Sequence, residues 1–300
     1  MLRRATILLA LLFGILPLHA ENNPDWTAPQ KPFRIAGNLY YVGSRDLASY
    51  LVVTPAGNIL INANLETSTP QIRGSVEALG FRWSDTRILL SSHAHFDHAA
   101  GSAAVLRQTG AKFMVMDDDV PLMESGGRSD FDHLPVFPPA HVDRTLHDGD
   151  TVTLGGVTLT ARKTPGHTRG CTTWTMQVTN EQGRKLNAVI VGGFSILSDY
   201  RLVATPAQPA SYPGIANDYA HTFALLLSLP CDIFLGAHGS YFNMQEKLSK
   251  LPTQGPSVWI DPDGYRQTFQ EAQRQFESTM KDQQSRSRIN RTRTPSSASP

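Results

Sequence analysis

Four potential metal ligands lie within six residues of this chain, in the segment 93–98. They are His93, His95, Asp97 and His98. The segment follows residues 87–92, whose apolar side chains are typical of a buried strand, and it precedes a run of small residues that favours a helix. Three imidazoles and a carboxylate would be costly to bury without partners, whereas a bound zinc ion would give each of them one. The pattern therefore predicts a metal site at a strand end, with a solvated histidine-rich loop as the alternative.

The rest of the chain alternates between strand-like and helix-like patterns, which predicts a layered α/β fold. In the first half we expect strands at 33–42, 50–53, 58–62, 87–92 and 112–116, and helices at 69–79 and 101–108. After an irregular surface excursion at 121–139, we expect strands at 151–154, 157–162, 173–178, 188–191 and 231–235, and helices at 215–229 and 265–283. The second half thus repeats the architectural style of the first.

The two ends of the chain differ from the middle in residue composition. Arg3 and Arg4 precede an apolar run and then Ala20, so residues 1–20 are predicted to be a secretory signal, with a retained anchor as the alternative. No later apolar run is long enough for a bilayer, so we expect an exported, periplasmic protein with no membrane span after signal removal. Residues 21–284 are then expected to form the folded domain. The arginine-rich stretch 285–300 is expected to be a disordered basic tail rather than a nucleic-acid or membrane arm.

Composition excludes some classes of protein. The formal net charge is only +1 and 40% of residues are apolar, so the chain has neither the charge of a nucleic-acid-binding protein nor the composition of a disordered one. Its two cysteines, Cys171 and Cys231, are too few for a disulfide scaffold. They could pair with each other or remain reduced.

Spacing suggests that the cluster serves two metal ions. His93 and His95 are two residues apart, so at the end of an extended strand they point to the same side. Asp97 and His98 come after the turn and can serve a second ion. A catalytic zinc usually has three protein ligands and one open position, so further ligands are needed.

Two other histidines have suitable positions for that role. His167 lies in a Pro-Gly turn at a strand tip, and His238 closes the apolar strand at 231–235. The remaining candidates lack such a position and are interpreted as loop or helix histidines: His133, His141, His147 and His221.

These motifs resemble those of the metallo-β-lactamase superfamily, in order and interval, across nearly all of the mature chain. Residues 170–174 and 229–232 are similar to its third subclass of zinc β-lactamases. The resemblance implies an αββα sandwich, in which two β-sheets are flanked by helices and the metals lie at one edge. It implies that the first zinc is bound by His93, His95 and His167, and the second by Asp97, His98 and His238. These six residues would also be the catalytic centre.

One departure within the superfamily bears on the substrate. Its glyoxalase-type hydrolases and lactonases carry an aspartate that bridges the two metals, where this chain has Gly192 and Gly193. Asp199 lies further on and is interpreted as a loop residue, while Ser195 and Ser198 could replace a serine that several relatives use in the site.

The resemblance therefore favours a β-lactamase, active in antibiotic resistance, whose small-molecule substrates are penicillins, cephalosporins and carbapenems. Zinc lowers the pKa of water from about 15.7 towards 7, so hydroxide would open the lactam ring without a serine or cysteine nucleophile. An exported lactone or ester hydrolase of the same fold, and a zinc-binding protein without catalysis, are the alternatives.

Overall fold

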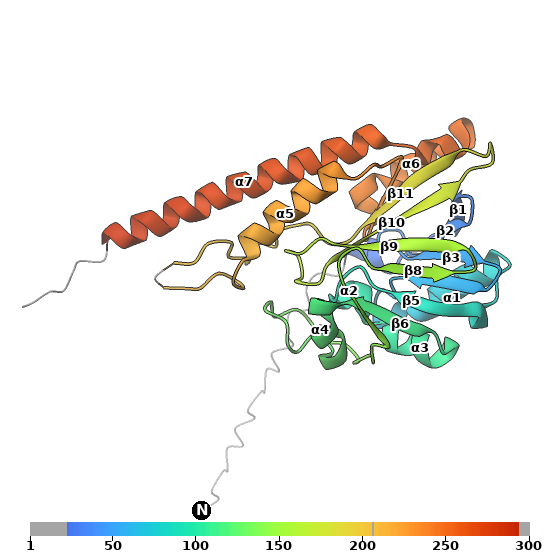
Figure 1. Cartoon of the computed structure of the whole chain (residues 1–300), viewed down its shortest axis with the longest axis horizontal. Coiled ribbons are helices and arrows are strands. Elements are labelled where there is room, and N and C mark those ends of the chain that lie inside the picture. Colours follow the sequence, from blue (N-terminus) through green and yellow to red (C-terminus); the bar gives the residue numbers. More distant parts are fainter. Residues whose placement is uncertain (1–22, 206, 294–300) are drawn as a thin grey trace, which may run out of the picture.

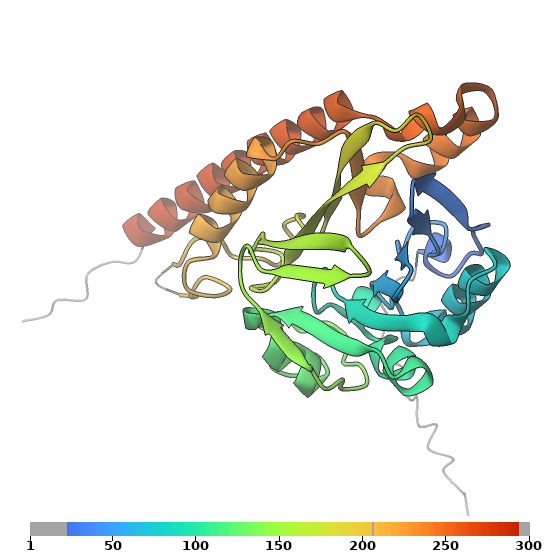
Figure 2. The same cartoon turned by 45° about the vertical axis from the view of Figure 1, so that its right-hand side comes forward.

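Two β-sheets lie face to face with helices on their outer sides (Figure 1). The computed structural model describes residues 23–205 and 207–293, so the predicted signal at 1–20 lies outside the described residues. The helices over the first sheet are α1 (Thr69–Ala78), α2 (Phe96–Ala99), α3 (Ser102–Thr109) and α4 (Val120–Ser125). Those of the second half are α5 (Ile215–Ser228), α6 (Met244–Gln254) and α7 (Pro262–Arg293) (Figure 2). The predicted αββα sandwich is confirmed.

The first sheet has seven strands in sequential order. An antiparallel meander is formed by β1 (Phe33–Ala36), β2 (Leu39–Tyr41), β3 (Tyr50–Thr54) and β4 (Gly57–Ile61). Parallel neighbours follow as β5 (Thr86–Leu90), β6 (Lys112–Met116) and β7 (Arg144–Leu146).

The second sheet has five strands and a similar plan. Its antiparallel part comprises β8 (Thr151–Leu154), β9 (Val157–Lys163), β10 (Thr172–Thr179) and β11 (Lys185–Val191), and β12 (Ile233–Gly236) pairs with β11 in parallel. The two sheets meet at one edge, where the amide of Ala48, in the β2–β3 loop, donates to the carbonyl of Ala237, after β12, at 2.9 Å. Residues that follow β5 and β12 therefore reach the same edge.

Alternation along the strands of the first sheet fills two cores. Ile88 and Leu90 point into the core shared with the second sheet, whereas Leu89 points into the core beneath α1 and α3. Each side chain is at most 6% exposed. Burial of both faces explains why this strand reads as a continuous apolar run in the sequence.

The structure differs from the sequence expectations in several segments. The predicted strand at 33–42 is a hairpin, because Gly37 adopts a φ of +52° and turns the chain between β1 and β2. Part of the irregular stretch at 121–139 is the short helix α4, and α6 was not predicted. The predicted tail at 285–300 begins too early: α7 continues to Arg293, because no proline or glycine interrupts the helix between Gly264 and Pro295. Ser287, within the predicted tail, is buried at 5% exposure. Residues 294–300 lie outside the described residues.

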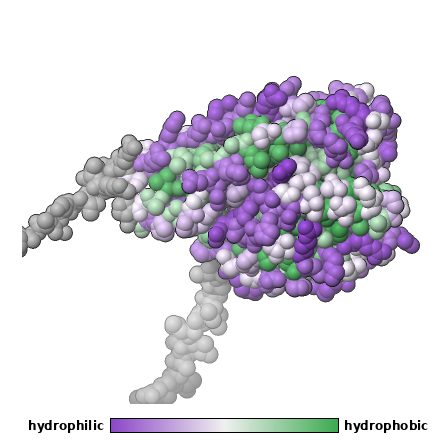
Figure 3. Space-filling view, in the orientation of Figure 1, coloured by the Kyte–Doolittle hydropathy of each residue, from purple (hydrophilic) through white to green (hydrophobic). Residues whose placement is uncertain are grey.

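The surface shows no large apolar region in the view of Figure 3, where polar side chains separate small apolar patches. Within residues 23–205 and 207–293, none of the helices combines the length and the apolar character that a bilayer crossing requires.

Candidate metal centre

The loop after β5 carries four of the six predicted ligands in a fixed conformation. The amide of Ser92 donates to Asn62 Oδ1 at 2.8 Å, and Trp174 Nε1 donates to the carbonyl of Ser91 at 3.1 Å. The carbonyl of His95 accepts from the amides of His98 and Ala99, which starts α2. The four ligand side chains belong to residues no more than 7% exposed: His93, His95, Asp97 and His98.

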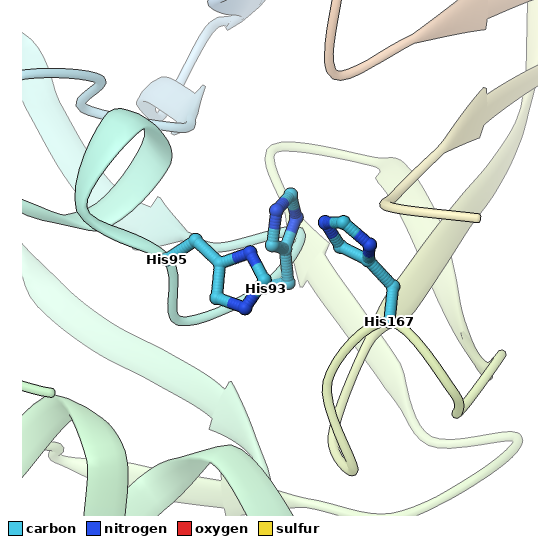
Figure 4. Close-up of side chains that lie close together, drawn as sticks. All are labelled: His93, His95 and His167. Atoms are coloured by element: carbon cyan, nitrogen blue, oxygen red, sulfur yellow. The ribbon is translucent and has the colours of Figure 1, made fainter. Parts of the chain in front are cut away.

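Three histidines form a first group of potential ligands (Figure 4). His93 and His95 come from the loop after β5, and His167 comes from the loop between β9 and β10. One ring nitrogen from each lies within 4.8 Å of the others, and Figure 4 shows the three rings facing a common space. This is the arrangement that a single ion with nitrogen ligands requires.

A second group consists of Asp97, His98 and His238, the last located just after β12. Nε2 of His98 lies 3.1 Å from Nε2 of His238 and 3.2 Å from Asp97 Oδ2. Asp97 Oδ2 is 3.5 Å from His238 Nε2, so the three atoms face one another. The rings of His93 and His98 are 4.3 Å apart, which places the two groups side by side.

In each ring, the nitrogen that contacts a residue outside the two groups shows which nitrogen is left to bind an ion. Nδ1 of His167 donates to the carbonyl of Ser195 at 2.8 Å, and Nδ1 of His238 donates to Asp46 Oδ2 at 2.9 Å, so Nε2 of each ring faces its group. Nδ1 of His93 lies 3.1 Å from Ser92 Oγ. Such outer contacts fix the tautomer and orientation of metal-binding histidines.

His95 is oriented the opposite way. Its Nε2 lies 3.4 Å from Asp132 Oδ2 and 3.8 Å from Asp130 Oδ2, which leaves Nδ1 for the first group. Tyr200 Oη lies 2.8 Å from Asp132 Oδ2 and 2.7 Å from the carbonyl oxygen of His167. Asp132 and Tyr200 thus connect the two loops that supply the first group.

The pKa shifts separate the two groups. Burial and the neighbouring imidazoles hold the pKa of His93 and His95 well below the usual value, and burial lowers the pKa of His167 to about 4. Burial also acts to lower the pKa of His238, but hydrogen bonds with Asp46 and Asp97 outweigh it and raise that pKa to about 9. Burial acts to raise the pKa of Asp97, but His98 and His238 hold it well below its usual range. The three imidazoles of the first group therefore favour the neutral form. The second group pairs the carboxylate of Asp97 with the imidazole of His238, while burial lowers the pKa of His98.

The residues present fit a metal ion. Within the described part of the chain, Nε2 of His93 is buried and has no hydrogen-bond partner, an arrangement that costs free energy unless the lone pair is used. Neutral imidazoles with one carboxylate are the donors that divalent transition metals prefer.

Comparison with known proteins agrees with this geometry. Residues 45–180 match the family model described as the metallo-beta-lactamase superfamily. The structure resembles the FEZ-1 metallo-beta-lactamase from Legionella gormanii with a TM-score of 0.82 and 50% sequence identity, over 86% of this chain and 98% of that one. It also resembles the class B3 di-zinc metallo-beta-lactamase LRA-12 from an Alaskan soil metagenome, with a TM-score of 0.79 and 39% identity over 87% of this chain and 98% of that one.

The chain belongs to the metallo-beta-lactamase superfamily. It is therefore a metal-binding hydrolase, and the predicted likeness to the third subclass is confirmed. A weaker match is the hydroxyacylglutathione hydrolase of Hyphomonas neptunium, 34% identical over 94 residues, which are 31% of this chain and 30% of that protein. The chain spans about half or less of the length of the curated relatives it matches.

This superfamily member has no room for a side chain at the position discussed above for the bridging aspartate. A Cβ atom on Gly193 would lie 1.9 Å from His167 Cδ2, and one on Gly192 would lie 2.7 Å from Cys171 Sγ. Asp199 is an exposed loop residue, as expected. Ser195 Oγ lies 3.5 Å from His167 Nδ1, whereas Ser198 is exposed. Glycine at 193 is thus required for His167 to occupy its place.

The cysteines and the remaining histidines take no part in the two groups. Cys171 and Cys231 are both free, and Cys171 donates to the carbonyl of Gly193 at 3.1 Å. The expected loop or helix positions are found for His133, His141, His147 and His221.

Sequence reasoning missed the residues that support the ligands. Asp46 lies in the β2–β3 loop and Tyr200 in the loop after β11, far from the ligands in sequence, and nothing in their local pattern indicates their contacts. Asp130 and Asp132 offered one signal, because two acidic residues with an aromatic residue between them interrupt an otherwise irregular stretch.

Proposed function

We propose that this protein is a β-lactamase that binds two zinc ions and hydrolyses the amide bond of penicillins, cephalosporins and carbapenems. The observation that carries the proposal is the full-length likeness to FEZ-1, half identical to this chain and covered to 98%, together with both ligand groups in place. The first ion would be held by His93, His95 and His167. The second would be held by Asp97, His98 and His238.

Zinc bound in the two groups would supply a hydroxide at neutral pH and polarise the lactam carbonyl. The protein's own part is to keep the imidazoles of the first group neutral by burial and to keep Asp97 ionised, so that its carboxylate can accept a hydrogen bond from the attacking water. Asp46 holds the ring of His238 through Nδ1.

Nearby hydroxyl and thiol groups are poorly placed to act as nucleophiles. Ser91 Oγ donates to the carbonyl of His93 at 3.0 Å, and Ser92 Oγ lies against His93 Nδ1. Cys171 is fully buried, and burial raises the pKa of its thiol. Water is therefore the nucleophile in the proposed reaction.

Aromatic side chains beside the second group suit an amphipathic ring substrate. Trp26 and Tyr241 are half-buried, and their rings lie 5.9 Å and 5.0 Å from the ring of His238. Such surfaces contribute apolar contact next to the polar reacting atoms.

A lactone or ester hydrolase of the same fold is the second candidate, favoured by the match to hydroxyacylglutathione hydrolase. The steric conflict between a side chain at 193 and His167 supports the β-lactamase over this alternative. A zinc-binding protein without catalysis is the third.

The deciding experiment mixes purified, zinc-loaded protein with a carbapenem, a cephalosporin, a simple lactone and a glutathione thioester, and follows each by absorbance. We expect turnover of both β-lactams, loss of it in EDTA and rescue by zinc. His93→Ala should be inactive, whereas His221→Ala, an exposed histidine on α5, should match the natural protein. Turnover of the lactone or thioester alone would support the second candidate, and no turnover of any substrate the third.

We also propose that residues 1–20 direct export to the periplasm. What supports this is the basic start followed by an apolar run and Ala20. Mass spectrometry of protein from the periplasmic fraction should find a chain that begins at Glu21. Recovery of the full-length chain from membranes would contradict cleavage.

A further inference from the structure

A buried carboxylate outside both ligand groups lies between the loops that form the first group. Asp119 ends the short 3-10 turn Asp117–Asp119 that follows β6, and it is 0% exposed. It stands at the start of α4, yet its side chain makes no capping hydrogen bond to that helix. The carboxylate points into the protein instead.

Its hydrogen bonds join two segments that are distant in sequence. Oδ2 accepts from the amide of Ala94 at 2.9 Å and from Thr168 Oγ1 at 2.8 Å, and Oδ1 accepts from the amide of Gly170 at 2.8 Å. Ala94 lies between His93 and His95 in the chain. Thr168 directly follows His167. One carboxylate therefore ties together the loops that supply all three histidines of the first group.

The fit around this carboxylate is close. A Cβ atom on Gly170 would lie 2.4 Å from the backbone nitrogen of Asp119 and 2.8 Å from its Cγ, so glycine is required there. The two amides can only donate, and both carboxylate oxygens accept. An asparagine would place an amide NH₂ against one of these N–H groups, leaving a buried donor without a partner.

The second group is supported differently. His238 is held by Asp46, which has no contact with the 164–170 loop among its hydrogen bonds. Asp97 and His98 belong to α2, whose first turn bonds to the carbonyl of His95 rather than to Asp119. Loss of the Asp119 contacts should therefore change the first group more than the second.

We propose that Asp119 is a positioning residue that sets the distance between the two histidine loops and thereby the affinity of the first group for its metal ion. The proposal rests on the two-metal site proposed above. It concerns metal binding, so it can fail while the β-lactamase activity stands.

The test compares Asp119→Asn and Thr168→Val with Thr164→Val. Thr164 and Thr168 flank His167, both are 0% exposed, and the hydroxyl of Thr164 bonds to Thr173 Oγ1 at 3.0 Å instead of to Asp119. Zinc affinity is measured by competition with a chromophoric chelator, cobalt spectra report the geometry of each site, and denaturant unfolding of the metal-free proteins reports folding.

Two variant backgrounds show which of the two ions each substitution affects. With His238→Ala only the first group is complete, and with His167→Ala only the second is. In the first background we expect Asp119→Asn to weaken binding at least about tenfold, the lower end of the cost of losing an outer support of a metal ligand. Thr168→Val should weaken it about fivefold, as expected for one hydrogen bond, and Thr164→Val should leave it unchanged. In the second background all three should bind alike.

The outcomes separate the hypotheses. Folded variants that bind both ions as the natural protein does would overturn the role of Asp119, as would equal weakening in both backgrounds. If Asp119→Asn does not fold, Thr168→Val against Thr164→Val decides. A natural protein that binds no zinc would overturn the proposed function itself, which is a different result from either of these.

Discussion

The two ligand groups lie side by side but are supported in different ways. In the first group, Nδ1 of His93 contacts a serine hydroxyl and Nδ1 of His167 contacts a backbone carbonyl, and burial keeps both rings neutral. In the second, Asp97 is ionised and the ring of His238 lies between two carboxylates. Orientation of His93 and His167 thus depends on neutral contacts, whereas orientation of His238 depends on its two carboxylate partners. Each prediction below tests this difference.

Removing one ligand from each group should have the largest effect. His167→Ala and His238→Ala should each bind one zinc ion fewer, measured by metal analysis. Since a metal ion stabilises the transition state by several kcal/mol, kcat should fall on the order of 1000-fold in each. If either variant stays within tenfold of the natural protein, that group is not required for the reaction.

The residues that orient the ligand histidines should contribute different amounts to metal affinity in the two groups. Asp46→Asn replaces the carboxylate that accepts from His238, so the second ion should bind about 10- to 100-fold more weakly. Ser92→Ala removes only a neutral contact of His93, so the affinity of the first group for its ion should fall about fivefold or less. Chelator competition measures both. Equal losses would show that charge does not distinguish the groups.

The pH dependence of stability should identify the carboxylate beside the first group. Burial raises the pKa of Asp119 to about 6 from 3.8, so the folded protein binds this proton more tightly than the unfolded chain does. The contribution of this bound proton to the free energy of unfolding is present at low pH and is lost as the pH rises from about 4 to about 6. Between these limits it amounts to on the order of 3 kcal/mol.

Urea unfolding of metal-free protein at several pH values provides the measurement. The free energy of unfolding of Asp119→Asn relative to that of the natural protein should increase as the pH rises from about 4 to about 6, because asparagine does not titrate. A difference independent of pH would show that Asp119 titrates normally.

The smallest effect is expected at the loop beside the first group. Gln283 on α7 accepts from the amide of Leu202 at 2.7 Å and donates to the carbonyl of Tyr200 at 2.9 Å, which fastens the segment that reaches His167. Gln283→Leu should raise KM by about fivefold with kcat nearly unchanged, because it removes the side-chain hydrogen bonds that hold this segment in place. Gln284→Leu, exposed and next in the helix, is the matched control. A fall in kcat alone would contradict a role in holding the loop.

Prediction from the sequence succeeded where the signal is local. The hairpin turn at residues 54–57, the strand β6 and the helix cap at Gly80 follow from turn residues and periodicity within a few positions. It failed where the deciding contact is distant. The helix α4 lies inside a stretch rich in glycine, serine and proline, and it packs against the first sheet through Leu122 and Met123.

The same distinction between local signals and distant contacts applies to the candidate site. The spacing of His93, His95, Asp97 and His98 predicts a metal site because adjacent residues on a strand end and a helix start must share a small volume. The assignment of His167 and His238 depended on resemblance to a family. Asp46, Asp119 and Tyr200 had no signal in the sequence, because each contacts a ligand loop from a different part of the chain.

The sequence by itself determined the donor chemistry of this protein and the alternation of strands and helices, since both depend on residue type and on spacing along the chain. Only the tertiary structure decided which histidines meet, which ring nitrogen each of them presents and why residue 193 must be glycine. Those properties depend on contacts between loops that the chain separates by dozens of residues and that two packed sheets bring to one edge.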